Sequence, residues 1–199
     1  MYQFIETICF EQGCFQRMEL HNLRLNRTRA HFFGKQQDIN LELLLKVPDQ
    51  LINETVKCTV TYGIDVLNIE FVKYTIRPIR SLRLVTDNSI DYAFKYADRS
   101  KLNALLNKKM ECDDILIVKN GLITDTSYAN AVFRHENIWH SQQNPLLFGT
   151  RLESYIRQGK VTPALLRAED LSRFSEVRII NAMISIENSP VIPIDAIHF

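Results

Sequence analysis

The most informative stretch of the chain is Tyr92-Ala-Phe-Lys-Tyr-Ala-Asp-Arg, in which one lysine stands between two aromatic residues. The leucines that follow predict a helix from Asp98 to about Lys109, with Asp98 as its N-cap. Aromatic neighbours exclude water from an amine, which disfavours the ammonium form and makes Lys95 available as a nucleophile. The simpler alternative is that Lys95 is one of many solvated lysines.

Beyond this helix the pattern becomes strand-like. Asn120-Gly121 separates two apolar runs, and this dipeptide is the strongest two-residue signal for a β-hairpin. The other expected elements are a turn at Glu136-Asn137, strands over 131–135, 138–140 and 177–186, and helices over 149–158 and 169–174. This part of the chain is therefore predicted to be a mostly antiparallel sheet wrapped by helices.

The part of the chain before residue 90 separates its strands from its helices. Two strands over 2–10 and 15–20 are expected to meet at the turn Glu11-Gln12-Gly13. The spacing of the apolar residues then changes to that of a helix, which predicts a helix from about Glu19 to Gly34. A second helix over 38–45 and strands over 55–63, 66–76 and 81–86 are expected to follow. Separate runs of this kind indicate the α+β fold class. We place a boundary at the turn-rich residues 86–89, which gives domains 1–87 and 88–199.

Composition excludes several classes of function. The chain has 199 residues, of which 46% are hydrophobic and 24% are charged, and its formal net charge is +1. A charge this small, with the basic residues scattered, gives no support for nucleic-acid or membrane binding. The sequence shows no signal peptide and no membrane-spanning run, so a cytoplasmic location is expected. The four cysteines lack metal-ligand spacing, and we expect no metal site.

Four motifs occur in a fixed order: Lys95–Arg99, Gly121–Phe133, Asn144–Arg151 and Ile180–Met183. Together they resemble the class IV aminotransferase family, the pyridoxal-phosphate enzymes of fold type IV, which include aminodeoxychorismate lyase. The resemblance implies a small N-terminal α/β sandwich and a C-terminal pseudo-barrel that carries the lysine. It also implies pyridoxal 5'-phosphate between the two domains, and a homodimer. The resemblance begins at Phe4-Ile-Glu-Thr, which implies that this chain lacks the segment that usually precedes this point in relatives.

The resemblance also assigns roles to residues. Lys95 is the catalytic lysine that binds the cofactor, and Asp125 takes the place of a glutamate facing the pyridine nitrogen. The His21-Asn-Leu-Arg24-Leu motif makes Arg24 the phosphate-binding arginine. The other implied cofactor-binding residues are Asn130, Gly149, Thr150, Asn181 and Ala182.

Each of these residues also has a plainer interpretation. Arg24 could be an exposed helix arginine, and Asp125 a turn residue at the end of a strand. Gly149 could be an ordinary turn glycine, and Asn181 a polar residue at a strand end. Arg151 stands one place earlier than the arginine of relatives, which leaves its role open. The phenols that could contact the cofactor ring are Tyr92, Tyr96 and Tyr128.

The closing Asn181-Ala-Met motif and its downstream prolines look most like the lyase branch of the family. That resemblance implies conversion of 4-amino-4-deoxychorismate to 4-aminobenzoate and pyruvate, a step in folate precursor synthesis. The alternatives are an aminotransferase for D-amino or branched-chain amino acids, and a relative without catalytic activity. Two substrate carboxylates call for cations, for which the candidates are Arg77, Arg80 and Arg99.

Overall fold

The computed structural model describes residues 2–199, which form two compact units. The first unit comprises the chain up to Thr75 together with Phe94–Asp98, and the second comprises Ile76–Ala93 and Arg99–Phe199. The boundary expected near residue 87 lies inside the second unit in this division. The reason is that β5 (Leu82–Thr86) pairs with two strands of that unit.

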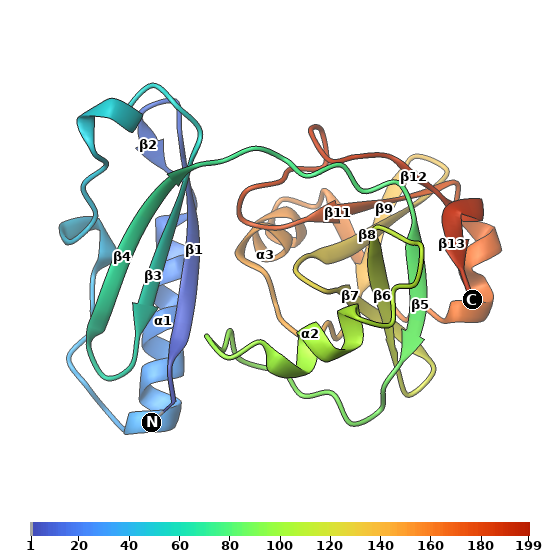
Figure 1. The fold of residues 1–199 in the computed structure, drawn as a ribbon, viewed down its shortest axis with the longest axis horizontal. Helices are drawn as coiled ribbons and strands as arrows, with labels where there is room; N and C mark the ends of the chain where they lie inside the picture. The colour runs from blue at the N-terminus through green and yellow to red at the C-terminus, as the bar shows by residue number, and fades with distance from the viewer. Residues whose placement is uncertain (1) are drawn as a thin grey trace. The chain divides into compact units, whose positions relative to one another are not determined.

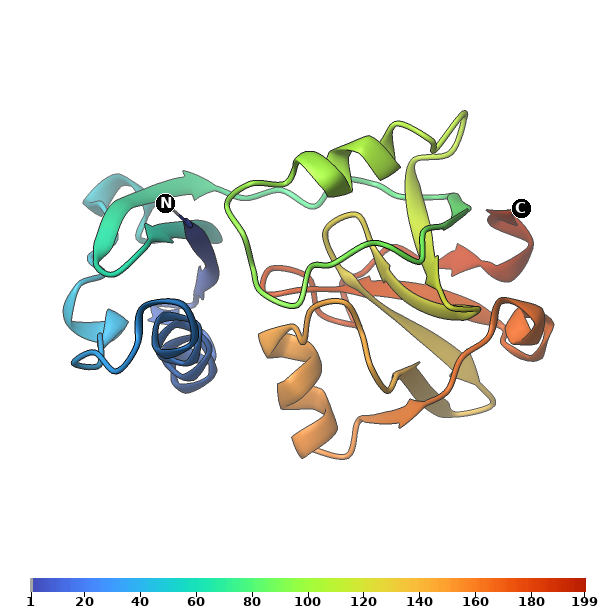
Figure 2. The same ribbon diagram turned by 90° about the horizontal axis from the view of Figure 1, so that it is seen from below.

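The first unit is a four-stranded antiparallel sheet with one long helix against it (Figures 1 and 2). Its strands are β1 (Phe4–Glu11), β2 (Cys14–Phe15), β3 (Val56–Tyr62) and β4 (Val66–Lys73), in the order β2-β1-β3-β4. The helix α1 (Met18–Phe33) directs Leu25 toward Phe4 and Val60 of the sheet, and these side chains are buried. The alternation of apolar residues along β1 and β3 thus produces the core that the sequence predicts.

Two local predictions in this unit are wrong. The second strand ends at Phe15, because α1 already begins at Met18. The segment expected to be helical over 38–45 forms only the 3₁₀ turn η1 (Leu41–Leu43), and another turn, η2 (Asp49–Leu51), follows. Asparagines of α1 accept the backbone N–H groups of Ile39 and Leu41, so side chains replace the helical hydrogen bonds there.

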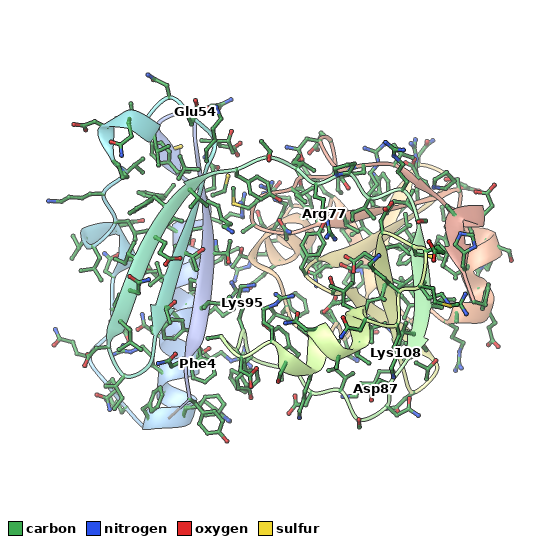
Figure 3. The ribbon with its side chains drawn as sticks, in the orientation of Figure 1. Phe4, Glu54, Arg77, Asp87, Lys95 and Lys108 are labelled. Atoms are coloured by element: carbon green, nitrogen blue, oxygen red, sulfur yellow. The ribbon has the colours of Figure 1, made fainter. Side chains whose placement is uncertain are left out.

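The segment Phe94–Asp98 returns to the first unit and runs beside β1. Ile5 N donates to Lys95 O at 2.9 Å, and Ala97 N donates to Gln3 O at 2.9 Å. Figure 3 shows Lys95 beside this strand. Two backbone hydrogen bonds therefore fix the lysine's place on the edge of the sheet.

The second unit is built on a larger mixed sheet in the order β10-β9-β8-β7-β6-β5-β13, with β11 and β12 beside β8. The other strands are β6 (Asp114–Lys119), β7 (Leu122–Thr126), β8 (Asn130–His135), β9 (Ile138–Gln142), β10 (Val161–Ala164), β11 (Glu176–Ile180), β12 (Ile192–Pro193) and β13 (Ile197–His198). Most neighbours are antiparallel, as predicted, but β5 runs parallel to both β6 and β13, and β10 runs parallel to β9.

The turns of this sheet follow the sequence closely. Asn120 and Gly121 both have positive φ, 53° and 77°, which confirms the predicted hairpin between β6 and β7. The turn at Glu136-Asn137 between β8 and β9 is also confirmed. The buried strand expected over 177–186 is shorter than predicted and ends at Ile180.

The helices of the second unit are α2 (Ser100–Leu106), α3 (Thr150–Arg157) and the 3₁₀ turns η3 (Ala168–Arg173) and η4 (Ile194–Ala196). The predicted cap of α2 is off by one residue, because Arg99 holds the N-cap position. The 169–174 helix is a 3₁₀ turn. Leu152 and Tyr155 of α3 pack on Val132 and Ile180, which anchors α3 to the sheet. The α+β class is confirmed by both units.

No helix within residues 2–199 combines the length and apolar character that a bilayer crossing requires.

Candidate active site

Most of the residues predicted to bind a cofactor belong to the second unit. These are Asp125, Asn130, Gly149, Thr150, Asn181 and Ala182, whereas Arg24 and Lys95 belong to the first unit. Each unit therefore presents its own set of predicted functional groups.

Asp125 and Asn130 form a buried pair across the β7–β8 hairpin, where they are directly opposite each other. Asn130 Nδ2 donates to Asp125 Oδ1 at 2.8 Å and to Leu147 O at 2.8 Å. Leu147 N donates to Asp125 Oδ2 at 2.9 Å. A carboxylate has about four lone-pair positions, and these contacts use one on each oxygen. Asp125 is therefore an oriented, buried acceptor inside a strand rather than a turn residue.

Gly149 packs directly against this pair. A Cβ built on Gly149 would overlap Asn130 Oδ1, so only glycine fits here without displacing the asparagine. The φ of Gly149 is −69°, so backbone conformation does not demand glycine. Close approach explains this glycine, and it brings the first turn of α3 next to Asp125 and Asn130.

Replacing Gly149 with alanine is expected to displace Asn130 and lower both stability and cofactor affinity. Overpacking of a well-packed site typically costs about 1–3 kcal/mol of the free energy of unfolding. Denaturant unfolding of the variant checks this, with Gly63→Ala as the control, because a Cβ at Gly63 meets its nearest atom, Tyr2 O, at 3.7 Å. Equal stability of Gly149→Ala and the wild type would contradict the packing argument.

Arg151 joins the two segments that were predicted to surround a phosphate. Its Nε donates to Asn181 O at 2.7 Å and its Nη2 donates to Ala182 O at 2.9 Å. Asn181 Oδ1 in turn accepts from the backbone N–H groups of Met183 and Ile184. The arginine that stands one place early in the sequence therefore holds the 181–184 turn against α3.

The start of α3 has the chemistry of an anion site. Glu153 N donates to Gly149 O at 2.9 Å and is the first helical bond, so the N–H groups of Thr150, Arg151 and Leu152 precede the regular helical pattern. Such N–H groups, with the positive end of the helix dipole, attract phosphate. The hydroxyl of Thr150 adds a donor at the same end.

In the first unit, Arg24 lies in a network that the sequence analysis missed. Its Nε donates to Glu6 Oε1 at 2.8 Å, and its Nη2 donates to Glu6 Oε2 at 2.6 Å. His21 Nδ1 contacts the same Oε2 at 2.6 Å. Glu6 and His21 are fully buried, and the Arg24 side chain is 17% exposed. The Arg24 side chain is thus largely buried and paired with Glu6, unlike an ordinary exposed helix arginine.

The protonation states of this network follow from its geometry. Burial would raise the pKa of Glu6, but the charge and hydrogen bonds of Arg24, with those of His21, hold the pKa at about 2. Burial lowers the pKa of His21 against the opposing effect of Glu6. At neutral pH, Glu6 is therefore ionised and His21 is a neutral donor through Nδ1–H. The sequence carried a signal for this network, because Glu6 occupies an inward position of an apolar strand and His21 and Arg24 share a helix face.

Lys95 stands between Phe94 and Tyr96 in the segment that returns to the first unit. It is half-buried, and the adjacent Phe94 ring lies 4.7 Å from His31 and 4.8 Å from Phe32, measured between ring centroids. These contacts belong to the Phe94 ring, and the reactivity of the Lys95 amine stays a prediction. Of the three candidate phenols, Tyr128 lies in the turn next to Asp125 and Asn130, with the Arg77 guanidinium 5.5 Å from its ring centroid.

Proteins from Haemophilus resemble the chain over nearly its whole length. An uncharacterised protein of Haemophilus influenzae (strain KW20 / Rd) is 36% identical over 185 residues, which cover 92% of this chain and 98% of that protein. A crystal structure described as "a putative 4-amino-4-deoxychorismate lyase" from Haemophilus somnus 129PT is 32% identical. The match covers 92% of this chain and 97% of that one, with a TM-score of 0.86. No family model matches the chain.

More distant solved structures share the fold. A hypothetical aminotransferase from Mycobacterium tuberculosis, solved with α-ketoglutarate and PMP bound, is 13% identical with a TM-score of 0.78. The match covers 96% of this chain and 80% of that one. Another structure of a hypothetical aminotransferase from M. tuberculosis, in a PLP-bound form, is 14% identical with a TM-score of 0.69, and the match covers 96% of this chain and 80% of that one.

Proposed function

This chain is an enzyme of the fold type IV family, which holds class IV aminotransferases and aminodeoxychorismate lyases, and we propose that it is a pyridoxal-phosphate-dependent lyase. Its substrate is 4-amino-4-deoxychorismate, and its products are 4-aminobenzoate and pyruvate. The observation that carries the proposal is the 32% identity to the Haemophilus somnus protein over nearly the full length of both chains.

The residues of the chain suit pyridoxal 5'-phosphate. When bound, this group supplies an electron sink for negative charge that develops beside the substrate nitrogen. The oriented carboxylate of Asp125 can keep a proton on the ring nitrogen, and Asn130 holds that carboxylate in place. The start of α3 offers backbone N–H groups and the Thr150 hydroxyl to a phosphate, and Arg151 holds the 181–184 turn against this end of the helix.

Lys95 performs two tasks in this proposal. Its amine would hold the cofactor covalently until substrate arrives, and its Nζ would then take the proton from the ring carbon that bears the amino group, while the bond between the neighbouring ring carbon and the enolpyruvyl oxygen breaks. Loss of that proton makes the ring aromatic as pyruvate leaves. Both tasks require the amine of Lys95 in its neutral form.

Two of the three candidate arginines for the substrate carboxylates converge on one turn. Arg99 Nη2 donates to Ser127 O at 2.7 Å, and Arg77 lies over the ring of Tyr128. Arg80 instead gives its backbone N–H to Asp113 Oδ2. Since Ser127 and Tyr128 follow Asp125 closely, Arg77 and Arg99 are the better candidates for binding substrate carboxylates.

The second candidate function is an aminotransferase for D-amino or branched-chain amino acids. The fold is shared with the hypothetical aminotransferase from M. tuberculosis. It is also shared with a structure from Thermotoga maritima described as "a putative branched-chain amino acid aminotransferase", at a TM-score of 0.76 and 16% identity. In this case Lys95 Nζ would move a proton between the amino acid and the cofactor.

One pair of assays separates these functions. Purified protein with added pyridoxal phosphate is expected to release 4-aminobenzoate and pyruvate in equal amounts from aminodeoxychorismate. The same protein, given D-amino or branched-chain amino donors with a keto acid, is expected to form no new amino acid. The reverse result would establish the aminotransferase, and activity in neither assay would favour the relative without catalytic activity.

We also propose that the protein is a homodimer in the cytoplasm. In the first unit β4 is an edge strand, and its Leu67 and Val72 side chains are 56% and 47% exposed. Exposed apolar residues on an open edge are typical of a surface that a partner covers. Light scattering at micromolar concentration is expected to give the mass of two chains. A mass of one chain in an active preparation would contradict the dimer.

A further inference from the structure

The buried network around Glu6 has no role in the chemistry described so far, although it contains the arginine assigned to the phosphate. We propose that Glu6, fixed by His21, is a positioning residue that orients the Arg24 guanidinium toward the phosphate of the cofactor. This inference rests on the proposed function, because it requires that the protein bind pyridoxal phosphate.

The hydrogen bonds between Glu6 and Arg24 fix the direction in which the Arg24 guanidinium points. Glu6 accepts from Nε and Nη2, which is the two-pronged arrangement of a planar guanidinium on a carboxylate. The opposite edge of the guanidinium, with Nη1, therefore points away from Glu6. An arginine on a helix surface has many rotamers, and a fork of this kind selects one of them.

His21 makes the fork rigid. Its neutral imidazole donates Nδ1–H to Glu6 Oε2, so the carboxylate is fixed from α1 by the side chains of two residues one helical turn apart. Both His21 and Glu6 are fully buried, so neither can exchange this contact for water. A buried ion pair usually adds little stability compared with a well-packed pair of apolar side chains at the same place. Stability therefore does not explain this network, whereas placement of the Arg24 guanidinium does.

Positioning and simple charge neutralisation predict opposite results. The negative charge of Glu6 offsets that of Arg24, so electrostatics alone would let phosphate bind more tightly once Glu6 is neutral. If Glu6 positions Arg24, phosphate binds more weakly once the fork is lost. The sign of the change in affinity therefore separates the two.

The test is Glu6→Gln in the full chain, with dissociation constants measured for pyridoxal phosphate and for pyridoxal, which lacks the phosphate. We expect the variant to bind pyridoxal phosphate about tenfold more weakly, because one charge-assisted contact is lost. We expect its affinity for pyridoxal to stay within about twofold of that of the wild type. Unchanged or tighter binding of pyridoxal phosphate would overturn the proposal. An equal loss for both compounds would also overturn it, because the role of Glu6 would then be structural.

Three further variants complete the experiment. Arg24→Ala is expected to show the same phosphate-specific loss, and Glu6→Gln is expected to add nothing to it, as for two residues that act as a unit. Glu54→Gln is the matched control, because Glu54 forms an exposed ion pair with Lys73 in the same unit, at 2.7 Å. If Glu6→Gln fails to fold, Glu6→Asp keeps the charge but withdraws the carboxylate, and it is expected to weaken pyridoxal phosphate binding in the same direction. A wild-type protein that does not bind pyridoxal phosphate would instead overturn the proposed function.

Discussion

Replacing Lys95 with alanine is expected to abolish turnover, with a loss of about four orders of magnitude or more, because the proposed function assigns both cofactor binding and transfer of the substrate proton to this one amine. Borohydride is expected to fix pyridoxal phosphate irreversibly to the wild-type chain and not to the variant. Peptide mapping of the reduced protein is expected to find the label on Lys95 alone.

The structure offers a matched control for this experiment. Lys101 lies six residues further on and is exposed, so Lys101→Ala removes a lysine from the same stretch of sequence without changing Lys95 or its neighbours Phe94 and Tyr96. It is expected to keep both the label and the turnover. A label on any other lysine, or turnover retained by Lys95→Ala, would show that the catalytic lysine has been misassigned.

Replacing Asp125 with asparagine is expected to lower turnover by about two to four orders of magnitude while the cofactor still binds to Lys95. A neutral amide cannot hold a proton on the ring nitrogen, so the cofactor becomes a poorer electron sink. Single-turnover kinetics measured with saturating cofactor isolate this loss from any change in affinity.

A structural effect of the same substitution has to be separated from the chemical one. Asp125 accepts from Asn130 Nδ2 and from Leu147 N, and an asparagine can accept on only one of its two terminal atoms. Asp125→Glu keeps the charge and is expected to retain more turnover than Asp125→Asn at similar stability. Similar turnover in the wild type and Asp125→Asn would show that this carboxylate does not face the ring.

Local signals in the sequence were sufficient for the hairpins and for the chemistry of single residues. Asn120 and Gly121 adopt positive φ because these two residue types tolerate the left-handed conformation that the hairpin turn requires. The helix expected over 38–45 failed for the opposite reason, since Asn22 and Asn26 on α1 capture its backbone groups. The residue pattern within the segment carries no signal for contacts that come from another helix.

The candidate site residues also divide into features that local sequence indicates and features that depend on distant contacts. Motifs located Asp125 and Asn130, but their mutual hydrogen bond and the exclusion of any Cβ at Gly149 emerge only from the pairing of β7 and β8. Arg151 could not be interpreted from spacing, because its partners are carbonyl groups some thirty residues away. Glu6 was missed because a single carboxylate in an apolar strand gains meaning only when its partners on α1 are known.

The return of Phe94–Asp98 to β1 has a consequence for how this chain can be built and recombined. The pairing of Ile5 with Lys95 joins positions 90 residues apart, so the edge of β1 stays open during synthesis until the chain through Asp98 has emerged. A gene fragment that stopped at Thr75 would encode a sheet without this short strand and without the lysine. Exchange of the first unit between relatives would therefore succeed only if five codons from the middle of the gene travelled with it.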